Sequence, residues 1–190
     1  MTKPIRSLLT KLLHGALLCS VLFQLIGSTW VEIPETTQPG NFFYELHQIV
    51  GLVTLALVTA FWVWVIARRR ETPIAGLFPW ASRTLLAALR ADMLRHCHCI
   101  RRLQIPPARD DSPVASAVHG LGLLAALAMA STGAWLFMQD VPSGWVLEVH
   151  KLVSNLMWAY VVGHAGLAVL HQLAGHQVLQ RMFRARPRNE

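Results

Sequence analysis

Four long stretches of the chain contain no Asp, Glu, Lys or Arg, and this feature restricts the possible folds more than any other. Each stretch exceeds the roughly 18 apolar residues that mark a candidate membrane span. Only 14% of the 190 residues are charged and 54% are hydrophobic, whereas a soluble domain usually carries about 25% charged residues. We therefore predict one all-α membrane domain, a four-helix bundle over residues 1–190, with spans at about 12–31, 43–67, 114–138 and 145–172.

The positive charges predict that both chain ends are cytoplasmic. Lys and Arg gather before the first span, in the loop 68–113 and after the fourth span, and an even number of spans places all three regions on one side. Such a bias marks the cytoplasmic face. Lys151 alone lies toward the other side, where the loops are acidic. The net charge of +7 therefore reflects topology and contact with membrane lipid rather than nucleic acid binding.

The loop 68–113 contains a second predicted element. Residues 82–102 alternate Leu and Met with Arg in the manner of a basic amphipathic helix on the inner membrane surface. The same segment carries His96, Cys97, His98 and Cys99, an alternation that does not match the CxxC spacing of zinc sites. The function of these four residues stays open.

Histidines inside the spans are the candidate functional residues. His150 and His164 lie fourteen residues apart, which is roughly 21 Å of helical rise with both rings on one face. His14 and His47 begin the first two spans and fall at the two matching depths. Four inward imidazoles at two levels suit two stacked haems, each with two axial histidines. Zinc would instead need three or four ligands close together.

The predicted pairs are His14 with His164 on the inner haem iron and His47 with His150 on the outer haem iron. His119 begins the third span on the inner side; it could replace His14, contact a quinone or a haem propionate, or make a polar contact between helices. Lys151 could bind a haem propionate or extend to the membrane interface. No residue is assigned a catalytic role.

The segment from His150 to His171 resembles the last helix of the bacterial cytochrome b561 family, and the likeness extends to the cytochrome b subunits of membrane hydrogenases and formate dehydrogenases. The resemblance implies a four-helix protein of the bacterial inner membrane with two haem b groups. Its ligand pattern is one histidine from each of the first two helices and two from the fourth. His14, His47, His150 and His164 match these positions, although Gly15 stands where many members have tryptophan.

The expected function is that of a di-haem b-type cytochrome that carries electrons across or within the inner membrane and exchanges them with quinone. One alternative is a superoxide:quinone oxidoreductase, which the acidic outer loops disfavour because superoxide is an anion. Another is an anchor subunit for a dehydrogenase or a c-type cytochrome, and a third is a haem-free transporter or structural membrane protein. Whether the chain is an enzyme stays open; if so, it is an oxidoreductase.

Overall fold

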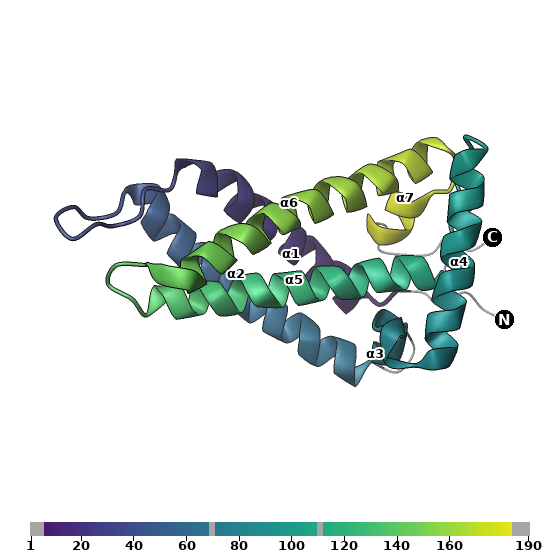
Figure 1. Ribbon diagram of the computed structural model, residues 1–190, viewed down its shortest axis with the longest axis horizontal. Coiled ribbons are helices and arrows are strands. Elements are labelled where there is room, and N and C mark those ends of the chain that lie inside the picture. Colours follow the sequence, from purple (N-terminus) through teal and green to yellow (C-terminus); the bar gives the residue numbers. More distant parts are fainter. Residues whose placement is uncertain (1–5, 69–70, 110–111, 184–190) are drawn as a thin grey trace. The chain divides into compact units, whose positions relative to one another are not determined.

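Helices make up nearly all the regular structure of the protein. The computed structural model describes residues 6–68, 71–109 and 112–183, with only the backbone of Arg181. Within these ranges the one extended feature is an isolated bridge between Glu35 and Gln38. The long helices are α1 (Leu8–Gly27, followed by the short helix η1, Ser28–Trp30), α2 (Phe42–Ala67), α5 (Pro113–Phe137) and α6 (Gly144–Leu173), drawn in Figure 1.

These four helices confirm the predicted all-α class, and each corresponds to one of the four predicted spans. Each is long and apolar enough to cross a membrane. The first span begins at Leu8 rather than near Leu12 and therefore includes Lys11. A lysine near a helix end can extend its ammonium group to the interface, so one turn of charged helix is tolerated there.

Large apolar side chains on these helices point outward. Ile49 and Ile66 on α2 are 62% and 66% exposed, and Val162 on α6 is 65% exposed. Exposing so much apolar surface to water would be unfavourable, whereas lipid hydrocarbon solvates it well. The pattern is that of helices surrounded by lipid.

The chain forms two compact units. Unit 1 comprises Met1–Lys11, Val65–Gly122 and Val161–Glu190, and unit 2 comprises Leu12–Trp64 and Leu123–Tyr160. Each long helix contributes residues to both units. A single functional domain over residues 1–190 stays a prediction.

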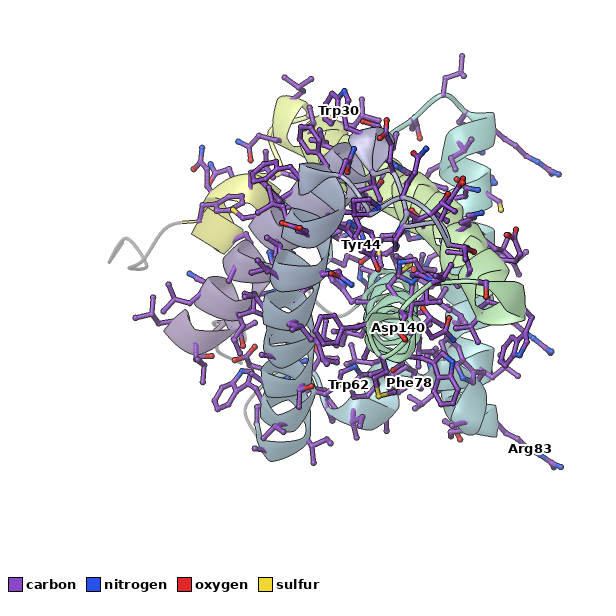
Figure 2. All side chains as sticks on the ribbon, turned by 90° about the vertical axis from the view of Figure 1, so that its left-hand side faces the viewer. Trp30, Tyr44, Trp62, Phe78, Arg83 and Asp140 are labelled. Carbon is purple, nitrogen blue, oxygen red and sulfur yellow. The ribbon has the colours of Figure 1, made fainter. Side chains whose placement is uncertain are left out.

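In unit 2, Asn41 fixes the start of α2 and hence the position of the residues that follow. Its Oδ1 atom accepts hydrogen bonds from the backbone N–H groups of Glu32 (3.3 Å) and Tyr44 (2.9 Å), and its Nδ2 atom donates to the Trp30 carbonyl (2.8 Å). Asparagine is a preferred residue at this capping position because its side chain satisfies an otherwise unpaired N–H group. The cap joins the end of η1 to the start of α2, where Trp30 and Tyr44 are labelled in Figure 2.

The buried core of unit 2 draws on all four long helices. Its hydrophobic members are Leu25 on α1, Val58 and Phe61 on α2, Leu136 on α5, and Val146 and Met157 on α6.

Unit 1 contains the other short helices, apart from η1 of unit 2. The predicted helix of the loop 68–113 is present as α4 (Arg83–Arg101), preceded by α3 (Ile74–Leu77) and the short helix η2 (Pro79–Ala81), neither of which was predicted, and α7 (Val178–Phe183) follows α6. α4 lies across the N-terminal end of α5 (Figure 1). The side chain of Arg83 extends away from the helix (Figure 2). The location of α4 on the membrane surface stays a prediction.

Gly120 marks the closest approach of α5 to the α3 region. It is buried, and a Cβ atom added there would collide with the carbonyl oxygen of Leu77. Leu77 is itself only 3% exposed. The close contact of two backbones therefore requires a residue without a side chain at position 120.

Gly120→Ala should destabilise the protein by about 1–3 kcal/mol, because a backbone carbonyl cannot move aside as a flexible side chain can. Thermal unfolding in detergent measures this. Gly166→Ala on α6 is the matched control, since nothing lies within 4 Å of a Cβ atom built there. Equal melting temperatures for the two variants would contradict the proposed contact.

Candidate functional site

His47 and His150 lie side by side in unit 2. His47 is in the second turn of α2 and His150 in the second turn of α6. Their ring centroids are 6.3 Å apart, and the ring planes are nearly perpendicular at 85°. The structure thus brings together the two residues that the sequence analysis paired.

Hydrogen bonding determines which nitrogen of His150 carries the proton. The Nδ1 atom lies 2.8 Å from the hydroxyl oxygen of Thr132 on α5. That hydroxyl has one hydrogen, which it donates to the Ala128 carbonyl at 2.7 Å. The hydroxyl therefore accepts from His150, so Nδ1 is protonated and the lone pair of the neutral ring lies on Nε2.

The residue next to Thr132 leaves space for the His150 ring. A Cβ atom built on Gly133 would lie 3.3 Å from the Cε1 atom of His150, which is tighter than ordinary van der Waals contact. α5 therefore contributes a polar partner and a glycine at consecutive positions. Together they set both the tautomer and the location of the imidazole.

His47 has a buried polar atom that needs a partner. Its Nδ1 atom forms no hydrogen bond within the described part of the chain. Its backbone carbonyl accepts a hydrogen bond of 2.9 Å from the Gln24 side chain on α1, which fixes this turn of α2. Because buried polar groups are nearly always satisfied, an unpaired imidazole nitrogen beside a second imidazole points to a bound ligand or metal.

A second pair of histidines lies in unit 1. The ring centroids of His119 on α5 and His164 on α6 are 5.1 Å apart, with a 79° angle between the planes. The Nδ1 atom of His119 lies 2.6 Å from the Ala115 carbonyl. A carbonyl only accepts, so Nδ1 carries the hydrogen and Nε2 carries the lone pair of the neutral ring.

The predicted contacts of His14 and Lys151 are not tested by the structure. His14 lies on α1 within unit 2, whereas His164 belongs to unit 1, so their pairing stays a prediction. Lys151 is exposed and forms an ion pair of 3.1 Å with Glu148. Its contact with a propionate also stays a prediction.

The segment of alternating histidine and cysteine lies on α4. Cys97 is exposed, and His96 donates from Nδ1 to the Asp92 carbonyl at 2.8 Å. Among the residues that the structure describes, no group of three or more His, Cys, Asp or Glu side chains could hold a metal ion.

Comparison with known proteins identifies the family. A family model described as prokaryotic cytochrome b561 matches residues 5–185, and the chain belongs to that family. It is a multi-pass membrane b-type cytochrome involved in electron transfer, and the family implies that it binds haem b. No curated protein and no solved structure matches the chain significantly.

The residues of unit 2 fit a haem iron. Two imidazoles on opposite sides of one ion, with metal–nitrogen bonds of about 2 Å, have centroids roughly 6 Å apart. The 6.3 Å separation of His47 and His150 agrees with this value. A ligating histidine usually donates its other N–H group to a nearby acceptor, as His150 does to Thr132.

Two buried carboxylates of unit 1 were missed by the sequence analysis. Glu71 accepts hydrogen bonds from the backbone of Ser7 (3.0 Å) and the hydroxyl of Thr10 (2.9 Å), and it pairs with Arg68 at 3.4 Å. Burial raises the pKa of the Glu71 carboxyl, but the hydrogen bonds from Ser7 and Thr10 outweigh this effect and the pKa is lowered. Glu71 thereby ties the start of α1 to the segment after α2.

Asp92 on α4 is 1% exposed and holds the start of α5. Its Oδ2 atom accepts from the Ser112 hydroxyl at 2.7 Å and the Val114 N–H group at 3.2 Å, and Arg95 pairs with Oδ1. Ser112 also accepts from the Ala115 N–H group at 3.2 Å, which makes it the N-cap of α5. Since His119 lies on the second turn of α5, Asp92 also helps to place that histidine.

Stability should depend on the ionised form of Asp92. Burial raises the pKa of this carboxyl, yet the hydrogen bonds from Ser112 and Val114, with the charges of His96 and Arg95, lower it overall. The folded pKa is then below the unfolded value of about 3.9. The stabilisation is complete above the unfolded pKa and is lost as pH falls through the folded pKa.

We expect Asp92→Asn to unfold more easily than the wild type at pH 7, by about 1–3 kcal/mol. The difference should shrink as pH falls below about 4. Thermal melts of both proteins across this range measure it, and taking the difference cancels the acid sensitivity of other groups. A gap that stays constant down to pH 3 would show that the charge is not the stabilising feature.

Proposed function

We propose that this cytochrome carries two haem b groups in a bacterial inner membrane and passes electrons between them and quinone. The observation that carries the proposal is the pair His47–His150, whose rings lie 6.3 Å apart and whose second member has its tautomer fixed by Thr132. Both features are those of axial ligands that are held ready before the metal binds.

Each residue of the outer site has a distinct role. His47 and His150 would hold the haem iron through their imidazole nitrogens, Thr132 orients the His150 ring, and Gly133 leaves the ring space. Haem iron with imidazole on both sides exchanges electrons and offers no open position for oxygen. The arrangement therefore favours electron transfer over oxygen chemistry.

At the inner site His14 and His164 are the proposed ligands, as the fourteen-residue spacing of His150 and His164 on α6 supports. His119 is the alternative to His14, favoured by a specific contact: its ring lies 5.1 Å from that of His164 within the same unit. If it is not a ligand, its position beside His164 is suited to a propionate or a quinone oxygen. Either role uses an imidazole near one membrane face.

The charge distribution supports the proposed orientation, with both chain ends in the cytoplasm. It also bears on superoxide as a substrate. Lys151, the cation nearest the proposed outer site in sequence, forms an exposed ion pair with Glu148, so part of its attraction for an anion is offset. Electron exchange with quinone is the better supported function, and a c-type cytochrome or a dehydrogenase subunit is the candidate protein partner.

A pyridine haem assay of the purified protein should give two haem b groups per chain. His47→Ala and His150→Ala should each remove one and the same haem, because an imidazole is lost from the outer iron. A reduced-minus-oxidised spectrum should retain the remaining haem in both variants. One haem in the wild type, or two haems in either variant, would refute the di-haem assignment.

The inner ligand is tested by the same assay on two further variants. If His14 is the ligand, His14→Ala loses the inner haem whereas His119→Ala retains it; the reverse result assigns His119. Retention of both haems in His164→Ala would contradict the inner pair altogether. Cys97→Ser on the exposed face of α4 is the control, and it should retain both haems.

Thr132→Val should keep both haems but raise the reduction potential of the outer one. Loss of the acceptor makes the His150 imidazole a weaker electron donor, which stabilises the ferric state less. A hydrogen bond worth about 0.5–1.5 kcal/mol corresponds to a shift of roughly 20–60 mV. Thr59→Val is the control, because among the described residues the Thr59 hydroxyl bonds to its own helix alone, at the Leu55 carbonyl. A redox titration in which both variants shift equally would exclude this role of Thr132.

A further inference from the structure

The end of α6 places two histidines in direct contact outside the proposed haem sites. The Nδ1 atoms of His171 and His176 are 2.9 Å apart, and the ring centroids are 5.1 Å apart. His171 lies in the last turn of α6, and His176 lies in the turn before α7. Both side chains are partly buried, so the pair is shielded and still open to solutes.

Backbone geometry holds this pair together. Gly175 has a φ of +83°, and two hydrogen bonds close the helix end: Gly175 N–H to the Gln172 carbonyl (3.1 Å) and His176 N–H to the His171 carbonyl (3.0 Å). These are the two bonds of a Schellman cap. In that cap the residues at the positions of His171 and His176 meet and usually make an apolar contact. Here two imidazoles occupy them.

The start of α7 restrains the turn further. The backbone N–H group of Leu179 donates to the Gln172 side chain at 3.1 Å, which joins α7 to the last turn of α6. Gln177 also has a positive φ of 53°, a left-handed conformation that ends the helical path of α6 before α7 begins. His176 is therefore held from both sides rather than placed at the end of a free segment.

We propose that His171 and His176 form a binding site for one divalent late transition-metal ion, of the zinc or copper class, with both Nδ1 atoms as ligands. Two nitrogens about 2 Å from such an ion are separated by roughly 2.9 Å at a 90° angle and by about 3.3 Å at the tetrahedral angle of zinc. The observed 2.9 Å lies at the short end of this range, and a few tenths of an ångström of opening brings the pair to the zinc value. Imidazole is a good ligand for these ions, and water completes the coordination, because the described residues contain no group of three or more suitable side chains.

The charge balance of the binding step is simple. In the metal-free pair one Nδ1 atom donates its hydrogen to the other. When the ion binds, that hydrogen moves to the Nε2 atom of the same ring, so both Nδ1 lone pairs face the metal and no proton need leave. The site also lies at the C-terminus of α6, where the helix dipole favours a cation. His96 of α4 is near enough to His171 to interact with it electrostatically.

The test is a calorimetric titration with Zn²⁺ of the haem-loaded protein purified without a histidine tag. The background carries Cys97→Ser and Cys99→Ser, because thiolates on α4 would otherwise compete for zinc. We expect one ion per chain. Chelation by two linked ligands exceeds single binding by about 100-fold or more, so His171→Gln and His176→Gln should each weaken binding by about that factor.

Two further variants separate the chelate from a general effect. Gly175→Ala keeps both imidazoles but forces a strained φ, so it should also weaken Zn²⁺ binding. His98→Gln, which removes an exposed histidine of α4, should leave the affinity unchanged. Unaltered haem spectra in all variants show that the fold and the haem sites are intact, so a failure here is distinct from a failure of the proposed electron transfer. Unchanged affinity in His171→Gln or His176→Gln, or equal loss in His98→Gln, would overturn the proposal.

Discussion

An imidazole ring inside an apolar helix bundle must have both nitrogens satisfied, and the structure of this cytochrome depends on that constraint. An unsatisfied polar group in hydrocarbon costs several kcal/mol. For His150 and His119 the chain itself satisfies Nδ1, through the Thr132 hydroxyl and the Ala115 carbonyl. The remaining nitrogen then carries the lone pair, which is the form that binds iron.

The same constraint explains why the pairs involve different helices. The backbone carbonyl one turn earlier can accept a hydrogen bond from a histidine on the same helix, as Ala115 does from His119. Such a bond does not bring a second imidazole close. The juxtaposition of His47 and His150 needs α2 and α6 to pack together, and α5 supplies the hydroxyl that orients one ring. Because many apolar side chains face outward, only a small number of inward residues form the packing between these helices.

Much of the fold could be predicted because charged side chains are costly in hydrocarbon and are therefore absent from long segments of the chain. The four spans and the helix over residues 83–101 follow from composition and periodicity. The pairing of His47 with His150 follows from their positions at the starts of two spans. Asp92 and Glu71 were missed because they lie in a polar loop, where a carboxylate is expected to be solvated, and nothing in their neighbours announces burial.

Contacts that depend on the rotation of one helix against another were also beyond the sequence. A one-residue shift in α5 would move Thr132 away from His150 by about 100° of rotation. The approach of His119 to His164 likewise depends on how α5 and α6 face each other. The short helices α3 and η2 were not foreseen, since a four-residue element lacks a measurable period.

In unit 2, α5 contributes no histidine, yet two of its neighbouring residues govern the ring of His150. A genetic screen that scores bacteria by colour would therefore overlook this helix. A variant that keeps its haems keeps its colour, even when a reduction potential has changed. Under the proposed ligation, substitution at positions 132 and 133 would adjust the driving force for electron transfer while the proposed iron ligands are retained.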